Sequence, residues 1–195
     1  MAVSQDILNR SFYENGDVVD VSKRLLGKVL CSQNGSVFTS GIITETEAYC
    51  GRNDKACHAN NGKRTPRTEV MFGEPGRAYI YLCYGIHHLF NVVTNQKGLA
   101  DAVLIRGIKP LEGIETMKSR RGMKSMKNLT NGPGKLTQAM GITTDYNRTS
   151  LWQPPIWIED REIQISENKI KVTKRIGVDY AEEDAKKPWR FVVDM

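Results

Sequence analysis

The sequence lacks the features of several classes of protein. Its first thirty residues hold no apolar stretch long enough for a membrane span or a secretory signal, because polar residues break the short runs Ile7-Leu8 and Val18-Val19. No repeat, low-complexity segment or linker divides the chain. Its 195 residues, 39% of them hydrophobic, suffice for one core. We therefore expect a single domain over residues 1–195 and an intracellular protein with no membrane attachment.

Cysteines are few and show no metal-binding pattern. The four of them, at positions 31, 50, 57 and 83, form no CxxC pair, and the chain is too long to need disulfide bonds for stability. A zinc site would recruit Cys50, Cys57 and His58, but the spacing of the two cysteines matches no usual zinc motif. We expect free thiols and no metal.

Acidic residues are outnumbered by basic ones, 22 to 28, which gives a net charge of +6. This total favours polyanionic partners only weakly, and the distribution says more. Residues 118–127 contain five basic side chains and no acidic one, and residues 52–67 are basic around a single acid, Asp54. Either run alone is typical of a solvated loop. Together they favour a phosphate-binding surface.

Hydrophobic periodicity and turn residues predict a mixture of short helices and strands, the mark of an α+β domain. The helices are expected over residues 4–10 with Ser4 as cap, 17–26, 110–121 and 135–140. The strands are expected over residues 28–31, 41–49, 78–84, 88–94, 102–108, 156–158, 163–165, 169–172 and 191–193. Asn34-Gly35 predicts a tight hairpin turn, and the long polar loop 51–66 suggests a binding role.

Two carboxylates and several aromatic residues stand out as candidates for chemistry. In a strand over residues 44–49, Glu45, Glu47 and Tyr49 share one face, which could also be no more than a solvent-facing edge. Tyr79 and Tyr81 share a face of another strand. Such tyrosines commonly pack in a core or at its rim, but on a basic protein they also make stacking platforms for bases.

The roles of three further residues depend on what surrounds them in the fold. Tyr84 stands at a hairpin tip beside Gly85, where an exposed aromatic ring is costly. His58 lies in the long polar loop, and its spacing leaves its role open. Arg106 is embedded in an apolar run and needs an anionic partner, either a carboxylate such as Glu47 or a DNA phosphate.

A set of short motifs, each weak alone but specific in order and spacing, carries a resemblance to a known family. The motifs are Leu26-Gly-Lys-Val-Leu30, Thr46-Glu-Ala-Tyr49, Thr65-Pro-Arg67, Met71-Phe72, Tyr81 with Tyr84-Gly85, Leu104-Ile-Arg106, Pro110-Leu-Glu-Gly113, Gly132-Pro133 with Lys135-Leu136, and Lys187-Pro188. From about Phe12 to Phe191 the chain resembles the methylpurine DNA glycosylases, also called alkyladenine or 3-methyladenine DNA glycosylases. The resemblance adds to the expected fold a curved antiparallel β-sheet with surrounding helices and a protruding β-hairpin.

The resemblance implies a monofunctional enzyme of base excision repair that needs no cofactor. Such an enzyme flips an alkylated or deaminated purine out of duplex DNA and hydrolyses its N-glycosidic bond, leaving an abasic site. Glu47 would activate the attacking water, and Arg106 would hold that water or a phosphate beside it. The expected partner is double-stranded DNA containing damaged purines, bound by a monomer. The expected location is the cytoplasm, near the nucleoid, in a prokaryote and the nucleus in a eukaryote.

Further roles follow from the resemblance, residue by residue. Tyr84 would fill the gap that the flipped base leaves, and Asn91 at the pocket floor would obstruct the exocyclic amino group of guanine. The pocket walls would stack on the extruded base, and two basic side chains would contact DNA. The walls correspond to Tyr49, His58 and Tyr81, and the DNA contacts to Lys135 and Arg67.

Two other functions remain compatible with these residues. A non-catalytic binder of nucleic acid on the same fold would keep the tyrosines and basic loops but would not need Glu47. A metal-dependent nuclease would use Glu45, Glu47 and Asp54 to hold Mg²⁺. Insensitivity of the activity to EDTA would exclude the nuclease.

Overall fold

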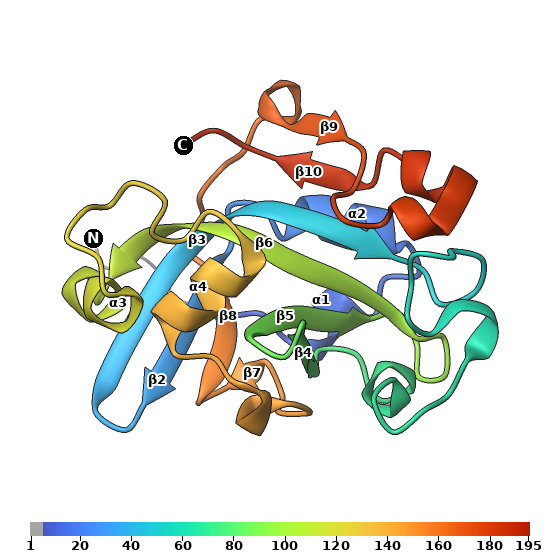
Figure 1. Ribbon diagram of the computed structural model, residues 1–195, viewed down its shortest axis with the longest axis horizontal. Coiled ribbons are helices and arrows are strands. Elements are labelled where there is room, and N and C mark those ends of the chain that lie inside the picture. The colour runs from blue at the N-terminus through green and yellow to red at the C-terminus, as the bar shows by residue number, and fades with distance from the viewer. Residues whose placement is uncertain (1–5) are drawn as a thin grey trace.

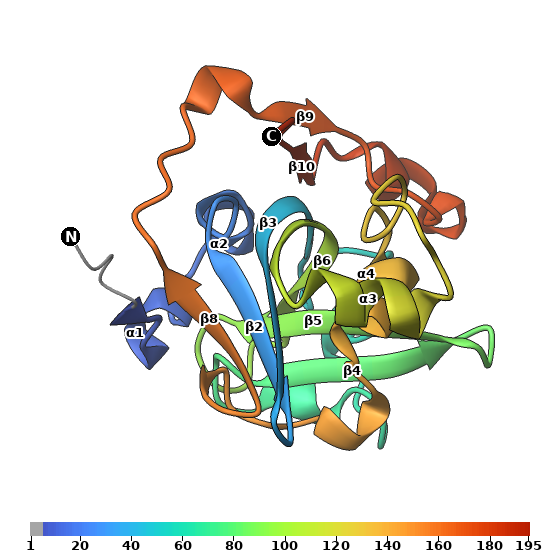
Figure 2. The same ribbon diagram turned by 90° about the vertical axis from the view of Figure 1, so that its left-hand side faces the viewer.

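A single antiparallel sheet organises the protein, whose computed structural model describes residues 6–195. Along the sheet the strands follow the order β1-β8-β2-β3-β6-β5-β4, while β7 pairs with β8, and β10 pairs with both β3 and β9. Figure 2 shows β2 and β3 standing upright and β4 and β5 lying across them, so the sheet is strongly curved. The strands are β1 (Asp6–Ile7), β2 (Val29–Asn34), β3 (Val37–Tyr49), β4 (Ala78–Cys83), β5 (His87–Thr94), β6 (Asp101–Glu112), β7 (Trp152–Gln153), β8 (Ile156–Asp160), β9 (Lys171–Thr173) and β10 (Arg190–Val192).

Short helices cover the sheet. In Figure 1, α4 lies in front of β5 and β6, while α2 lies behind β3 and β6, and the main core fills the space between sheet and helices. Within residues 6–195, none of the helices is both long enough and apolar enough to cross a bilayer. The helices are α1 (Arg10–Tyr13), α2 (Val18–Arg24), α3 (Ile114–Arg121) and α4 (Pro133–Met140), with 3-10 turns η1 (Asn60–Gly62), η2 (Glu69–Phe72), η3 (Thr144–Tyr146), η4 (Glu167–Lys169) and η5 (Asp179–Lys186).

Local sequence signals define the ends of the helices. The carboxylate of Asp17 accepts the backbone N–H groups of Val19 and Asp20, which caps the first turn of α2. Pro133 occupies the first turn of α4, where the helix needs no N–H donor. Gly141 ends α4 in the left-handed conformation, with a φ of 69°. The α+β class and the curved antiparallel sheet expected from the sequence are confirmed.

Three predicted elements were wrong. Residues 6–7 form β1, which pairs with β8, instead of a helix over 4–10, whose expected cap Ser4 lies outside the described residues. The helix predicted from Pro110 begins only at Ile114, because residues 110–112 still pair with β3 and the left-handed Gly113 breaks the strand. Residues 163–165 form no strand; Ile163 and Ile165 alternate because both pack onto buried clusters.

The β4–β5 hairpin carries an exposed tyrosine at its tip. Tyr84 and Gly85 both have positive φ, 51° and 72°, as the two central residues of a type I′ turn require. Figure 2 shows the hairpin reaching outward past α3 and α4. Tyr84 is 91% exposed, so its ring contributes little to the core. Packing of the core therefore does not explain why a tyrosine stands at the tip of this hairpin.

Candidate active site

Four neighbouring strands bring one row of side chains to the same face of the sheet. Tyr79 of β4 lies opposite Asn91 of β5, and Asn91 lies opposite Leu104 of β6. Leu104 in turn lies opposite Glu47 of β3. Directly opposed residues of antiparallel strands project together. The sheet thus places a tyrosine, an amide and a carboxylate in one line, although they come from segments far apart in the sequence.

Glu47 is completely buried, and its carboxylate accepts two hydrogen bonds and faces one guanidinium group. The hydroxyl of Tyr49 donates to Oε2 at 2.6 Å, and the backbone N–H of Ile176 donates to Oε1 at 2.8 Å. Arg106 Nε lies 3.4 Å from Oε1. Burial raises the pKa of Glu47 above its ordinary value, against the opposing effects of Arg106 and of the two hydrogen bonds. The carboxylate is therefore a better proton acceptor than an exposed glutamate.

Arg106 has the anionic partner that a charged side chain in an apolar run requires. Its Nε donates to Glu45 Oε1 at 2.8 Å, closer than Glu47. Glu45 also accepts from Arg190 Nε of β10 at 2.7 Å. Register shifts on both sides of Glu45 in the β3–β6 pairing mark an irregular stretch at this point of the strand. Arg106 thus sits between two carboxylates at the edge of a cavity that it also lines.

An aromatic cavity of about 200 Å³ opens beside the carboxylates. Tyr49, His58, Tyr79 and Tyr81 all line it. The ring centroids of Tyr79 and Tyr81 are 5.3 Å apart, and His58 meets Tyr81 edge-on at 4.8 Å. Glu47 does not line the cavity itself but lies directly behind Tyr49. Flat aromatic walls around a space of this size suit a planar ring such as a purine base.

His58 is held in its neutral form by its neighbours. Its Nδ1 lies 2.8 Å from the hydroxyl of Tyr79, and Arg67 Nη2 lies 2.9 Å from its Nε2. Burial and the positive charge of Arg67 lower the pKa of His58 to about 4. The Arg67 guanidinium also lies over the ring of Tyr81, 4.4 Å from its centroid. Arg67, predicted as a DNA contact, therefore stands against the outer wall of the cavity.

Asn91 has a fixed orientation on the cavity floor. Its side-chain Nδ2 donates to the carbonyl oxygens of Tyr79 at 3.0 Å and Leu89 at 3.3 Å. The two carbonyls belong to β4 and β5, and Asn91 itself lines the cavity. The two hydrogen bonds therefore hold the amide in one orientation.

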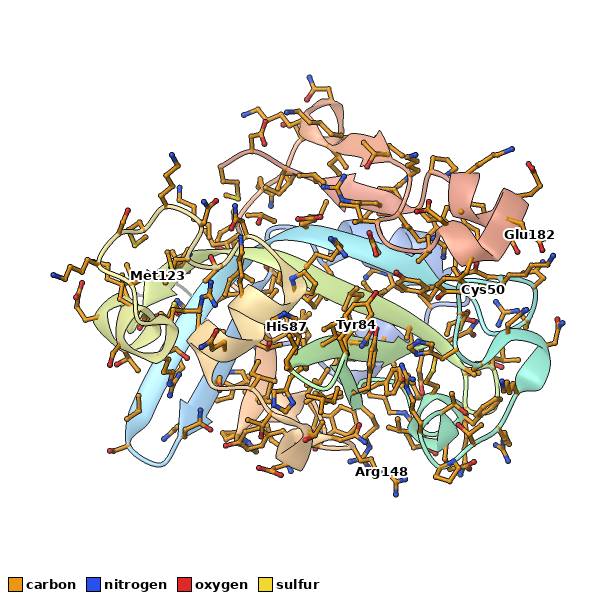
Figure 3. All side chains as sticks on the ribbon, in the orientation of Figure 1. Cys50, Tyr84, His87, Met123, Arg148 and Glu182 are labelled. Atoms are coloured by element: carbon orange, nitrogen blue, oxygen red, sulfur yellow. The ribbon has the colours of Figure 1, made fainter. Side chains whose placement is uncertain are left out.

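The two remaining predicted residues lie at different distances from this cavity. Tyr84 contributes to its lining at the mouth, and Figure 3 places it near the middle of the face between α4 and the loop after β3. Lys135 is on α4, where its Nζ donates to Asn131 Oδ1 at 3.2 Å, and it does not line the cavity. The structure thus gathers the predicted base-binding residues around one space and leaves Lys135 apart from it.

One side of the site comes from a segment that the sequence did not mark. Ile176, Val178 and Tyr180 line the cavity, and Tyr180 donates its hydroxyl to the carbonyl of Ala56 at 3.1 Å. A backbone donor such as the N–H of Ile176 has no signature in a sequence. Arg175 does have a signature, because it is a charged residue in the apolar run 175–178, just as Arg106 is a charged residue in an apolar run. The same signal could have identified both arginines.

The metal-binding alternatives do not match the arrangement of side chains. Asp54, which the nuclease would share with Glu45 and Glu47, instead accepts two hydrogen bonds from Arg175. Cys50 and Cys57 are buried as free thiols. Throughout residues 6–195, no three histidine, cysteine, aspartate or glutamate side chains are grouped so that they could hold a metal ion.

The chain is similar to known proteins over nearly its whole length. Residues 11–195 match the family described as Methylpurine-DNA glycosylase (MPG). A protein of Bacillus thuringiensis (strain Al Hakam) named "Putative 3-methyladenine DNA glycosylase" is 50% identical over 190 residues, which cover 93% of this chain and 92% of the relative. Relatives of the same name from Bacillus cereus (strain AH187) and Bacillus anthracis (strain CDC 684 / NRRL 3495) are each 49% identical, with the same shares covered.

Proposed function

The chain belongs to the methylpurine-DNA glycosylase family, and from this membership we propose how it releases damaged purines from DNA. As a DNA glycosylase it is a hydrolase of N-glycosyl bonds and acts in base excision repair. The substrates proposed here are alkylated and deaminated purines in duplex DNA, the product is an abasic site, and the enzyme works as a monomer without a cofactor. The observation that carries the proposal is the buried carboxylate of Glu47, which accepts two hydrogen bonds and pairs with Arg106 beside an aromatic cavity.

A base stacked in a duplex is out of reach of this cavity, so the nucleotide has to be flipped out. Flipping costs a few kcal/mol, and least for a damaged or mispaired base. Tyr84, exposed at the hairpin tip and at the cavity mouth, fills the gap in the helix. Tyr49, His58 and Tyr81 stack on the extruded base, and at roughly 1–3 kcal/mol per stacking contact they offset the cost of flipping.

Cleavage needs a water molecule and a proton acceptor on the sugar side of the flipped base. As the bond between C1′ and the base nitrogen lengthens, its electron pair leaves with the base and positive charge develops on the sugar. The water oxygen bonds to C1′ and its proton passes to Glu47, while Arg106 orients the water or the adjacent phosphate. A positioned general base contributes about 10²–10⁴-fold in rate. The negative charge of Glu47 also stabilises the developing cation.

Selection among purines uses both charge and shape. An electron-rich tyrosine face attracts cationic bases such as 7-methylguanine. The rigid Asn91 on the floor obstructs the exocyclic amino group of normal guanine. Base release without strand cleavage is the expected outcome, because strand cleavage would need a lysine amine for Schiff-base chemistry and no lysine of residues 6–195, Lys135 included, is among those that line the cavity. Lys135 and Arg67 contact DNA phosphates, aided by the basic segment 118–127.

The decisive experiment replaces Glu47 with glutamine and measures single-turnover base release from duplexes that carry one lesion each. A panel of 3-methyladenine, 7-methylguanine, hypoxanthine and ethenoadenine also ranks the substrates. We expect Glu47→Gln to bind lesion DNA as the parent does but to lose about 10²–10⁴-fold in release. Glu69→Gln, at an exposed position of η2, is the matched control and should retain full activity. An unchanged rate of base release by Glu47→Gln would contradict the mechanism. Inhibition of the activity by EDTA would favour the metal-dependent nuclease.

A further inference from the structure

An ion pair with no exposed surface lies behind the aromatic wall. Arg175 donates two parallel hydrogen bonds to the carboxylate of Asp54, from Nη1 to Oδ2 at 2.6 Å and from Nη2 to Oδ1 at 2.7 Å. Neither side chain has any exposed surface. Burying two charges costs several kcal/mol per ion, so such a pair is a poor means of gaining stability. Its forked geometry does fix the relative position of the segments that carry it.

The pair joins three parts of the chain that build the site. Besides Asp54, Arg175 donates to the carbonyl of Ala48 on β3 at 2.9 Å and to the carbonyl of Asp184 in η5 at 2.9 Å. Asp54 accepts the N–H of Ala56, a cavity-lining residue, at 3.2 Å. Figure 1 shows η5 beside the loop that follows β3, the two segments that the ion pair joins.

Both hydrogen-bond donors to Glu47 adjoin Arg175. The first is the backbone N–H of Ile176, the next residue in the chain. The second is the hydroxyl of Tyr49, whose ring lies against the Arg175 guanidinium with its centroid 4.9 Å from Cζ. Arg106, the ion-pair partner of Glu47, donates its Nε hydrogen to Glu45 instead. The two donors to the carboxylate thus lie next to the buried ion pair.

We propose that Arg175, paired with Asp54, is a positioning residue that holds the hydroxyl of Tyr49 and the N–H of Ile176 on the carboxylate of Glu47. This role rests on the proposed function of Glu47 as the base. It explains why a costly buried ion pair is placed next to the site: the pair keeps the carboxylate in one orientation, ready to receive the proton of the water.

The charges around Glu47 determine the direction of the expected effect. Glu45 lies on the same strand, Arg106 faces it from β6, and Arg190 on β10 neutralises Glu45. Arg175 stands behind Tyr49. Without Arg175, Glu47 loses a nearby positive charge and two well-placed donors, and both losses disfavour the ionised carboxylate. The pKa of Glu47 should therefore rise.

The test compares Arg175→Met, Arg175→Lys and Asp54→Asn with the full-length parent. Glutamate side-chain carboxyl carbons are labelled with ¹³C and titrated by NMR, and the Glu47 resonance is assigned by its absence from Glu47→Gln. Single-turnover release from hypoxanthine duplexes is measured against pH, together with affinity for the same duplexes and thermal unfolding. Arg161→Met is the matched control, because Arg161 makes a similar pair with Glu159 away from the cavity.

We expect base release by Arg175→Met to fall on the order of 10²-fold, as for a small misplacement of a reacting group, while lesion affinity changes only a few-fold. The Glu47 titration and the acid limb of the rate profile should both move to higher pH. Arg175→Lys, which keeps the charge, should restore part of the rate. Arg161→Met should lose stability but leave both pH dependences where they are in the parent.

If Arg175→Met does not fold, Asp54→Asn takes its place in the rate measurement, because it keeps the size and an acceptor oxygen but weakens the hold on Arg175. Folded Arg175→Met with the parent's Glu47 titration and acid limb, or folded Asp54→Asn with the parent's rate of base release, would overturn the proposal. Failure of the proposed function gives a different result. In that case Glu47→Gln still releases the base, whereas the Glu47 titration still moves in the Arg175 variants.

Discussion

Replacing Glu47 with glutamine should make the protein more stable at neutral pH while lowering base release by about 10²–10⁴-fold. The buried carboxylate accepts the N–H of Ile176 through Oε1 and the hydroxyl of Tyr49 through Oε2. A glutamine oxygen can take the place of Oε1. Its amide then faces the Tyr49 hydroxyl, which can rotate its hydrogen away and become the acceptor. Arg106 retains Glu45 as its partner, so no charge is left alone.

The sign of the effect follows from the raised pKa of Glu47. Burial raises this pKa in the folded state, so over the pH range between the unfolded and folded values the folded protein binds more protons. Stability therefore falls as pH rises through that range, and above the folded pKa the ionised carboxylate costs stability. Glutamine does not titrate. Its advantage should be full above the folded pKa of Glu47 and vanish below the ordinary glutamate pKa of about 4.3.

Thermal unfolding followed by circular dichroism from pH 4 to pH 8 measures this difference. For a domain of this length, each 1 kcal/mol of removed cost appears as about 2–4 °C in Tm. The exposed Glu69→Gln variant should unfold like the parent at every pH. A lower Tm for Glu47→Gln at neutral pH, or a gain that stays constant down to pH 4, would refute the reasoning about the buried carboxylate.

Three further outcomes test the pocket. Tyr84→Ala should leave Tm unchanged, because the side chain is 91% exposed, but should weaken binding to lesion duplexes by about 1–3 kcal/mol in a fluorescence titration; equal affinities would contradict the role as a wedge. Asn91→Ser should release guanine-type bases faster relative to hypoxanthine, and an unchanged substrate profile would argue against a steric gate. The His58 imidazole should stay neutral in ¹⁵N NMR spectra down to about pH 4, and Arg67→Gln should raise that value, because the cation then no longer opposes protonation; a midpoint near that of an exposed histidine would show that the ring is not buried as described.

The parts of the site that lie on regular strands were predictable from the sequence. Glu47 and Tyr49 share a face because side chains alternate, and the hydrogen bond between them follows from that spacing. The position of Tyr84 followed from the neighbouring turn glycine. The need of Arg106 for an anionic partner was equally readable, but its choice of Glu45 over Glu47 was not, since it depends on the register shifts beside Glu45.

Features set by distant packing were not predictable in this way. The Arg175–Asp54 pair joins residues 121 positions apart, and its geometry depends on the route of the whole C-terminal segment. The placement of Arg67 against His58 needed the fold of an irregular loop. Among the elements, the strand β6 outlasts its expected end because pairing with β3 outweighs the local preference for a helix over residues 110–113.

The bond between Glu47 and Ile176 spans 129 positions in the chain, which has a consequence for synthesis. At the usual ribosomal rates, roughly 6 to 26 s pass between the emergence of these two residues. During that time a nascent chain already carries Tyr49, Tyr81 and Tyr84, but it has neither the N–H of Ile176 nor the guanidinium of Arg175. Under the proposed mechanism, unfinished or prematurely terminated chains should therefore release bases poorly, and full activity should arise only with the nearly complete protein.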